Sequence, residues 1–134
     1  MTTKHATGTF EVKVTPMPPE EGTGGPAIGR MSIDKQFAGD LAGSSKGKML
    51  GYQASGNGGY VAMEQVTGSL DGKKGGFILQ HIGTMEPGKS DLNVAVVPGS
   101  GTNDLTGIAG TMAIIIAQGK HTYKFDYTLP AVRR

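Results

Sequence analysis

The sequence predicts an all-β fold, an eight-stranded antiparallel β-barrel with little helix. Polar and apolar residues alternate along eight segments, as they do in strands that bury one face. Glycine accounts for 23 of the 134 residues, against an average share of about 7%, and gathers at the ends of these segments, where turns and bulges need positive φ. No apolar repeat at helical spacing is sustained. Closure into a barrel would hide the edges of such a sheet, and a two-sheet sandwich is the alternative that the sequence leaves open.

The expected strands differ in what their apolar faces carry. In the second, Lys35 shares a face with Ile33 and Phe37, which places a charge on an apolar side. In the last, Tyr123 and Phe125 belong to an aromatic stripe that alternates strictly with polar residues. The expected strands cover residues 6–14, 28–37, 41–54, 60–70, 76–85, 92–97, 105–117 and 122–129.

Turn chemistry separates these strands. Residues 55–59 predict a hairpin turn, because their Asn57-Gly58 pair readily supplies two positive φ values. Residues 71–75, 86–89 and 118–120 predict further tight turns. Residues 15–27 are rich in proline and glycine, so we expect the longest loop of a single domain, 1–134, to lie there. This loop is either a tolerated insertion or a lid over the barrel mouth.

The composition argues against several classes of function. The 13 Lys and Arg nearly balance the 11 Asp and Glu and do not cluster among aromatic residues, so we expect no nucleic-acid partner. There is no cysteine, which excludes disulfides, thiolate metal sites and cysteine nucleophiles. We expect His5 in the N-terminal segment and His121 in a turn. The scattered histidines lack metal-ligand spacing, and we expect neither a metal nor a cofactor.

The chain also lacks the marks of a membrane protein. Its longest apolar run, residues 112–117, is far shorter than the roughly 20 residues that a spanning helix needs. The first residues contain no apolar segment typical of a signal peptide. We therefore expect a cytoplasmic protein with no membrane partner.

Polar residues on apolar strand faces are the candidate site. His81 shares a face with Phe77 and Leu79, where it is either a core histidine with both nitrogens satisfied or a general base. Glu64 lies on a partly apolar face, where a carboxylate needs a partner or a raised pKa unless it is exposed at an edge. If the fourth and fifth strands form a hairpin, Glu64 and His81 become neighbours, and Lys35 could supply a countercharge. Gln80 points the opposite way from His81, so only one of the two faces inward.

Two other features have weaker claims to function. The stripe that contains Tyr123 is either barrel filling, a subunit interface or a ligand platform. Gly99-Ser100-Gly101-Thr102 has the composition of a phosphate loop, but such a loop must open a helix. Because a strand is expected next, we interpret it as a bulged connection between strands.

Several motifs resemble a known family. The Gly-Ser-Gly-Thr turn followed by Leu-x-Gly-x-x-Gly resembles the corresponding segment of allene oxide cyclase and dirigent barrels, and further stretches are similar to the bacterial DUF3224 family. The resemblance implies an eight-stranded antiparallel barrel, often met as an oligomer, and no reaction. The stretches that carry it are residues 7–12, 37–41, 60–64, 77–84, 99–102 and 105–110.

Three functions remain open from the sequence. The first is a barrel that binds a small hydrophobic molecule, with Lys35, Glu64, Gln80, His81 and Tyr123 as candidate ligand-binding residues. The second is an enzyme of the cyclase or isomerase type, with Glu64 and His81 as candidate catalytic residues. The third is a structural or interaction protein whose barrel is filled by its own side chains.

Overall fold

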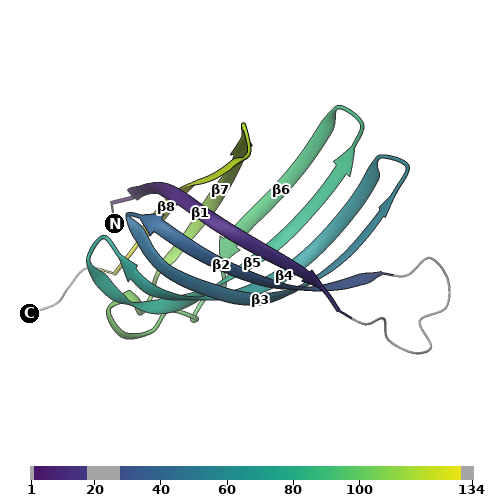
Figure 1. Ribbon diagram of the computed structural model, residues 1–134. Coiled ribbons are helices and arrows are strands. Elements are labelled where there is room, and N and C mark those ends of the chain that lie inside the picture. Colours follow the sequence, from purple (N-terminus) through teal and green to yellow (C-terminus); the bar gives the residue numbers. More distant parts are fainter. Residues whose placement is uncertain (1, 18–27, 131–134) are drawn as a thin grey trace, which may run out of the picture.

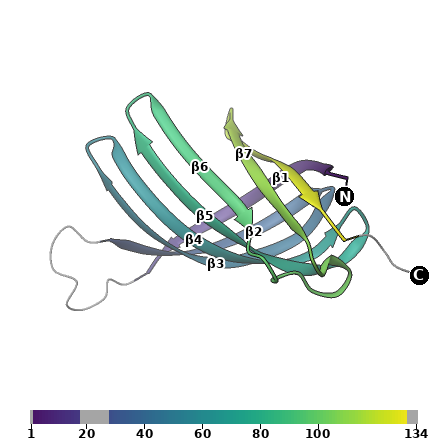
Figure 2. The same cartoon turned by 180° about the vertical axis from the view of Figure 1, so that it is seen from behind.

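Eight antiparallel strands close into a barrel in which each strand pairs with its neighbours in the sequence, and β8 pairs with β1 (Figures 1 and 2). The computed structural model describes residues 2–17 and 28–130. The strands are β1 Lys4–Pro16, β2 Gly29–Gly39, β3 Leu41–Ala54, β4 Asn57–Leu70, β5 Lys73–Glu86, β6 Lys89–Val96, β7 Ala109–Ala117 and β8 Lys120–Thr128. The predicted barrel is confirmed, and one short 3-10 helix, η1 Asn103–Leu105, is the only helix among the described residues.

The turn between β3 and β4 lies within the predicted residues 55–59, but it is not formed by Asn57-Gly58. Positive φ values fall at Ser55 and Gly56, 53° and 82°, whereas Asn57 already pairs with Ala54 as part of the ladder. This register sets Gly47 opposite Glu64, where a Cβ at Gly47 would collide with the backbone of β4. The pairing of β3 with β4, which requires glycine at position 47, therefore determines which residues form the turn. The local preference of Asn-Gly for positive φ does not.

Several strand boundaries also differ from the predicted ones, among them the start of β7 and the end of β1. Strand β7 begins at Ala109 and not near residue 105, because η1 turns Leu105 into the core, where it is 1% exposed. At the other boundary, Thr15 and Pro16 extend β1 and pair with Ser32 and Met31, so the predicted loop of residues 15–27 begins later. Its residues 18–27, and with them the predicted lid or insertion, lie outside the described residues.

The barrel has two unlike ends. We call the end with the turn Asp71-Gly72 and η1 the capped end. The interior there is filled by side chains exposed by 2% or less, including those of the predicted aromatic stripe. These buried residues are Leu41, Leu70, Phe77, Leu105, Ile108, Tyr123, Phe125 and Tyr127.

The opposite end carries the turns at residues 55–56, 87–88 and 118–119, and we call it the hairpin end. Figure 1 shows the hairpin of β5 and β6 rising away from that of β7 and β8 there. Among the described residues, β6 and β7 form a single bridge pair, Ala95 with Thr111. The barrel is thus closed most weakly along this seam.

Within residues 2–17 and 28–130, no helix has the length and apolar character that a membrane span requires.

Candidate functional site

A cluster of polar side chains lies inside the barrel between its two ends. Four neighbouring strands contribute one buried residue each: Lys35 from β2, Ser45 from β3, Glu64 from β4 and His81 from β5. Their exposed fractions are between 1% and 5%. Inner-face positions alternate along each strand, and this alternation brings all four to the same surface.

The carboxylate of Glu64 is the centre of the cluster. Its Oε1 accepts hydrogen bonds from Lys35 Nζ at 2.9 Å and from His81 Nε2 at 2.6 Å. Its Oε2 accepts one from Ser45 Oγ at 2.5 Å. The ammonium group of Lys35 also lies 4.8 Å from the centre of the Phe10 ring, where a cation is attracted by the aromatic face. Every member of the cluster therefore has a partner, as buried charges require.

These partners keep Glu64 ionised. Burial alone would raise the pKa of its carboxyl group, because a charge is costly away from water. The hydrogen bond from His81, the charge of Lys35 and the hydrogen bond from Ser45 outweigh burial and lower this pKa from 4.5 to about 2. Glu64 is consequently a carboxylate that only accepts hydrogen bonds at neutral pH.

Tyr60 extends the cluster toward the hairpin end. Its hydroxyl lies 3.1 Å from His81 Nδ1, and its ring is half-buried. Gly83 lies opposite Tyr60 in the ladder, and a Cβ at Gly83 would stand only 2.8 Å from the Tyr60 ring. The glycine thus makes room for the ring. Burial, and then the charge of Glu64, raises the pKa of Tyr60, which keeps it a neutral phenol.

Beyond Tyr60 the inner face is apolar and partly exposed. Alternation places four exposed hydrophobic residues on this face near the hairpin end, and solvent reaches them there. They are Val14, Met85, Leu92 and Ile116, with exposed fractions of 43%, 54%, 46% and 67%. The inner surface at the hairpin end is therefore accessible, in contrast to the filled capped end.

The structure brings together three of the five predicted ligand-binding residues. Glu64 and His81 meet as predicted from a hairpin of the fourth and fifth strands, and Lys35, from β2, supplies the countercharge. His81 faces inward, whereas Gln80 is exposed on the outer face. Tyr123 lies toward the capped end, where its hydroxyl accepts a hydrogen bond from Leu41 N and donates to backbone carbonyl oxygens.

The remaining two histidines lie apart from the cluster and not where they were predicted. His5 belongs to β1 and not to a loose terminus, and its Nδ1 lies 2.6 Å from Asp126 on the surface. His121 belongs to β8 and not to a turn, and its ring stands 5.2 Å from that of Phe10. No group of three metal-ligating side chains occurs within residues 2–17 and 28–130.

Sequence reasoning missed Ser45 and Tyr60 as cluster members. Tyr60 lies four residues from Glu64 on the same strand, so the two side chains point to the same face. This alternation could have indicated Tyr60 as a member of the cluster. Ser45 lies in the polar run Ser44-Ser45-Lys46, in which no apolar alternation marks the inner face.

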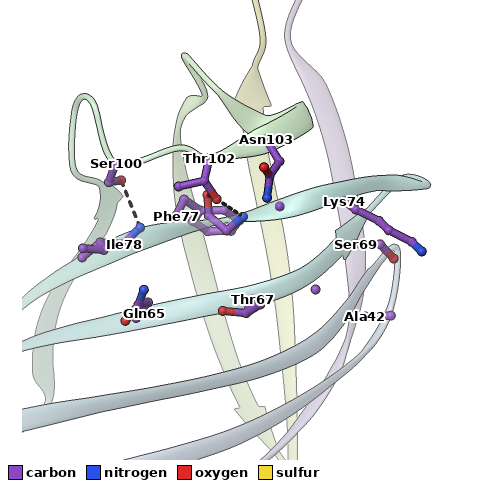
Figure 3. Close-up of a pocket in the computed structure, with 13 residues that line it drawn as sticks. Ala42, Gln65, Thr67, Ser69, Lys74, Phe77, Ile78, Ser100, Thr102 and Asn103 are labelled. Atoms are coloured by element: carbon purple, nitrogen blue, oxygen red, sulfur yellow. Dashed lines mark hydrogen bonds between the residues drawn. The ribbon is translucent and has the colours of Figure 1, made fainter.

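A second feature, a depression of about 540 Å³, lies on the outer face where residues 100–103 cross β5 (Figure 3). Its central polar groups already have partners. Ser100 Oγ accepts a hydrogen bond from Ile78 N and donates to Val97 O, and Thr102 Oγ1 accepts one from Gly76 N. The Gly-Ser-Gly-Thr segment therefore belongs to a connection between strands, as predicted, and its hydroxyl groups fasten this connection to β5. The element that follows it directly is η1 and not the expected strand, but η1 is too short to form an anion site.

Comparisons with known proteins agree with this fold. A family model described as "Protein of unknown function (DUF3224)" matches residues 6–127. Among solved structures, the chain is similar to a protein of unknown function from the DUF3224 family of Shewanella oneidensis MR-1, with 44% sequence identity and a TM-score of 0.90. The match covers 98% of this chain and 100% of the other. A comparison with curated proteins found no significant match.

Proposed function

This chain belongs to the DUF3224 family of proteins of unknown function, and we propose that it binds a small, largely apolar molecule inside the hairpin end of its barrel. The observation that carries the proposal is a fully hydrogen-bonded polar cluster at the base of an accessible apolar surface. An apolar wall with a few fixed polar groups is the usual composition of a small-molecule site.

The unequal filling of the barrel supports this location. An eight-stranded barrel has an interior that either is filled by side chains or holds one small ligand. At the capped end, large aromatic and aliphatic residues occupy the interior. At the hairpin end, Leu92 and Ile116 lie on the inner face but remain 46% and 67% exposed, so a ligand there would remove apolar surface from water.

The cost of the cluster supports a functional role as well. Burying Lys35 and Glu64 requires the removal of two charges from water, and such pairs are frequently no more stabilising than apolar residues of similar volume. A barrel that only needed filling could use hydrophobic residues at these positions. The retained charges are instead linked, through His81, to the half-buried hydroxyl of Tyr60.

Titration with the neutral apolar dye Nile red tests the proposal. Leu92→Lys places a charge on the inner face, and Ile82→Lys is the matched control on the outer face of the same hairpin, where Ile82 is 54% exposed. We expect Leu92→Lys to weaken dye binding about tenfold or more, the effect of losing roughly 1.4 kcal/mol of apolar contact. The control should bind like the unmodified protein.

Equal binding by both variants would place the dye on the outer face and contradict the proposal, as would an absence of dye binding to the unmodified protein. Mass spectrometry of gently purified native protein complements the titration. A co-purifying small molecule that is lost in Leu92→Lys and retained in Ile82→Lys would identify the natural ligand.

An enzyme of the cyclase or isomerase type is the second candidate. The chain from Glu64 through His81 to Tyr60 favours it, because a carboxylate that orients an imidazole is a common arrangement for moving protons. Turnover that is lost in His81→Ala while dye binding persists would distinguish this enzyme from a carrier.

A further inference from the structure

The direction of each hydrogen bond in the cluster determines what Tyr60 offers to a ligand. Glu64 is a carboxylate and can only accept, so His81 Nε2, 2.6 Å from Oε1, carries a proton. In the neutral imidazole the other nitrogen, Nδ1, is then an acceptor. The Tyr60 hydroxyl lies 3.1 Å from Nδ1 and is then the donor of the hydrogen bond between them. Toward a ligand, the Tyr60 oxygen therefore offers its lone pairs, which accept a hydrogen bond.

Tyr60 is also the member of the cluster that a ligand can reach. Lys35, Ser45, Glu64 and His81 are exposed by at most 5%, whereas Tyr60 is half-buried and stands next to the accessible inner face. A ligand that enters from the hairpin end therefore meets a hydrogen-bond acceptor at the base of an apolar wall.

We propose that Tyr60 accepts a hydrogen bond from a hydroxyl group of the ligand, and that a weakly acidic phenol or enol is held there as its anion. The inference rests on the proposed function, since it assumes a ligand at the hairpin end. It adds the chemical class of that ligand: an apolar body that bears one acidic hydroxyl.

The proton transfer balances within the cluster. The ligand O–H bond breaks, its electron pair stays on the ligand oxygen, and its proton goes to the Tyr60 oxygen. At the same time the Tyr60 hydroxyl proton moves to His81 Nδ1, so that imidazole becomes imidazolium. Tyr60 remains a neutral phenol and now donates to the ligand anion. No oxidant, metal or further reactant is required.

The surrounding charges favour this outcome. Glu64 and Tyr60 from β4 are hydrogen-bonded to His81. Lys35 from β2 is bonded to the same Oε1 of Glu64, and the ladder partner of His81 on β6 is the apolar Val94. Lys35 and Glu64 form a neutral pair before the transfer. The new imidazolium lies against the Glu64 carboxylate, where an opposite charge stabilises it, and the ligand anion balances it on the other side.

Two probes that differ in one methyl group test the inference. 4-Hydroxyacetophenone has an acidic phenol, which stays protonated in neutral buffer, and 4-methoxyacetophenone lacks that proton. We expect the unmodified protein to bind the phenol about tenfold more tightly than the ether, as expected for one hydrogen bond to a charge-linked group. The bound phenol should show the red-shifted absorption band of a phenolate.

Tyr60→Phe retains the ring and removes the hydroxyl. We expect it to bind both probes equally, with no phenolate band, whereas Tyr52→Phe, on the outer face of β3, should behave as the unmodified protein. Equal binding of both probes by the unmodified protein, or a preference that persists in Tyr60→Phe, would overturn the inference. If either result occurs while Nile red still binds to the protein, the proposed function remains intact. If Nile red does not bind, the inference and the proposed function are both overturned.

Discussion

His81 donates a hydrogen bond to Glu64 across 2.6 Å although the two residues are not paired in the ladder. The direct partner of His81 on β4 is Ala62, and that of Glu64 on β5 is Leu79. The two side chains meet on the diagonal, which long side chains can span. The small side chain of Ala62 leaves the imidazole room to lean toward the carboxylate. The cluster therefore depends on the exact register of β4 and β5.

Removing the charge of Glu64 should cost far more than removing a surface charge. Glu64→Gln leaves Lys35 buried without its counter-ion, and we expect the free energy of unfolding to fall by about 3–5 kcal/mol. Asp126→Asn removes the partner of His5, in a pair whose side chains are 70% and 55% exposed, and should cost less than about 1 kcal/mol. Urea denaturation measures both. Similar losses in the two variants would contradict a structural role for the buried cluster.

The same carboxylate should make stability depend on acid pH. Because folding lowers the pKa of Glu64 from 4.5 to about 2, its ionisation contributes about 3 kcal/mol of stability that is fully present above pH 4.5. This contribution is lost as the pH falls toward about 2. We therefore expect the difference in unfolding free energy between the unmodified protein and Glu64→Gln to shrink over this range. A difference that stays constant with pH would show that the carboxyl group has an ordinary pKa.

Gly47 should be essential for the register of β3 and β4. A Cβ at this position would collide with the Met63 carbonyl oxygen and approach Glu64, so we expect Gly47→Ala to destabilise the protein by about 1–3 kcal/mol or more. Gly59→Ala is the matched control, because its Cβ would meet no atom closer than 3.5 Å. Thermal melting compares the two variants. Equal melting temperatures would mean that β3 and β4 tolerate a wider separation than the structure has.

Much of this architecture could be predicted because strand alternation is a local property. The alternation of Lys35, Glu64 and His81 with neighbouring residues placed all three on apolar strand faces, and the hairpin turn at Asp71-Gly72 made the last two neighbours. The inward direction of His81 and the outward direction of Gln80 follow from the same alternation once the sheet is closed. Alternation separates the two faces of each strand, but only the closed barrel determines which face points inward.

Other features depend on contacts that no local pattern contains. The β3–β4 turn was predicted within residues 55–59 from the preference of Asn57-Gly58 for positive φ, but the ladder that includes Gly47 and Glu64 determines the register and places the turn at Ser55-Gly56. Alternation also cannot distinguish a buried inner-face residue from an exposed one. Leu79 and Leu92 both lie on the inner face, yet their exposed fractions are 0% and 46%, because only the capped end is filled.

The ring nitrogens of His81 provide the most direct test of the ligand site. Nitrogen-15 NMR in neutral buffer distinguishes an imidazole protonated at one nitrogen from an imidazolium, and His5, which lies on the surface, is an internal control. We expect free His81 to carry its proton on Nε2 and to gain a second proton on Nδ1 when 4-hydroxyacetophenone saturates the protein, while His5 stays unchanged. A His81 spectrum that is the same in free and saturated protein would contradict binding at the cluster.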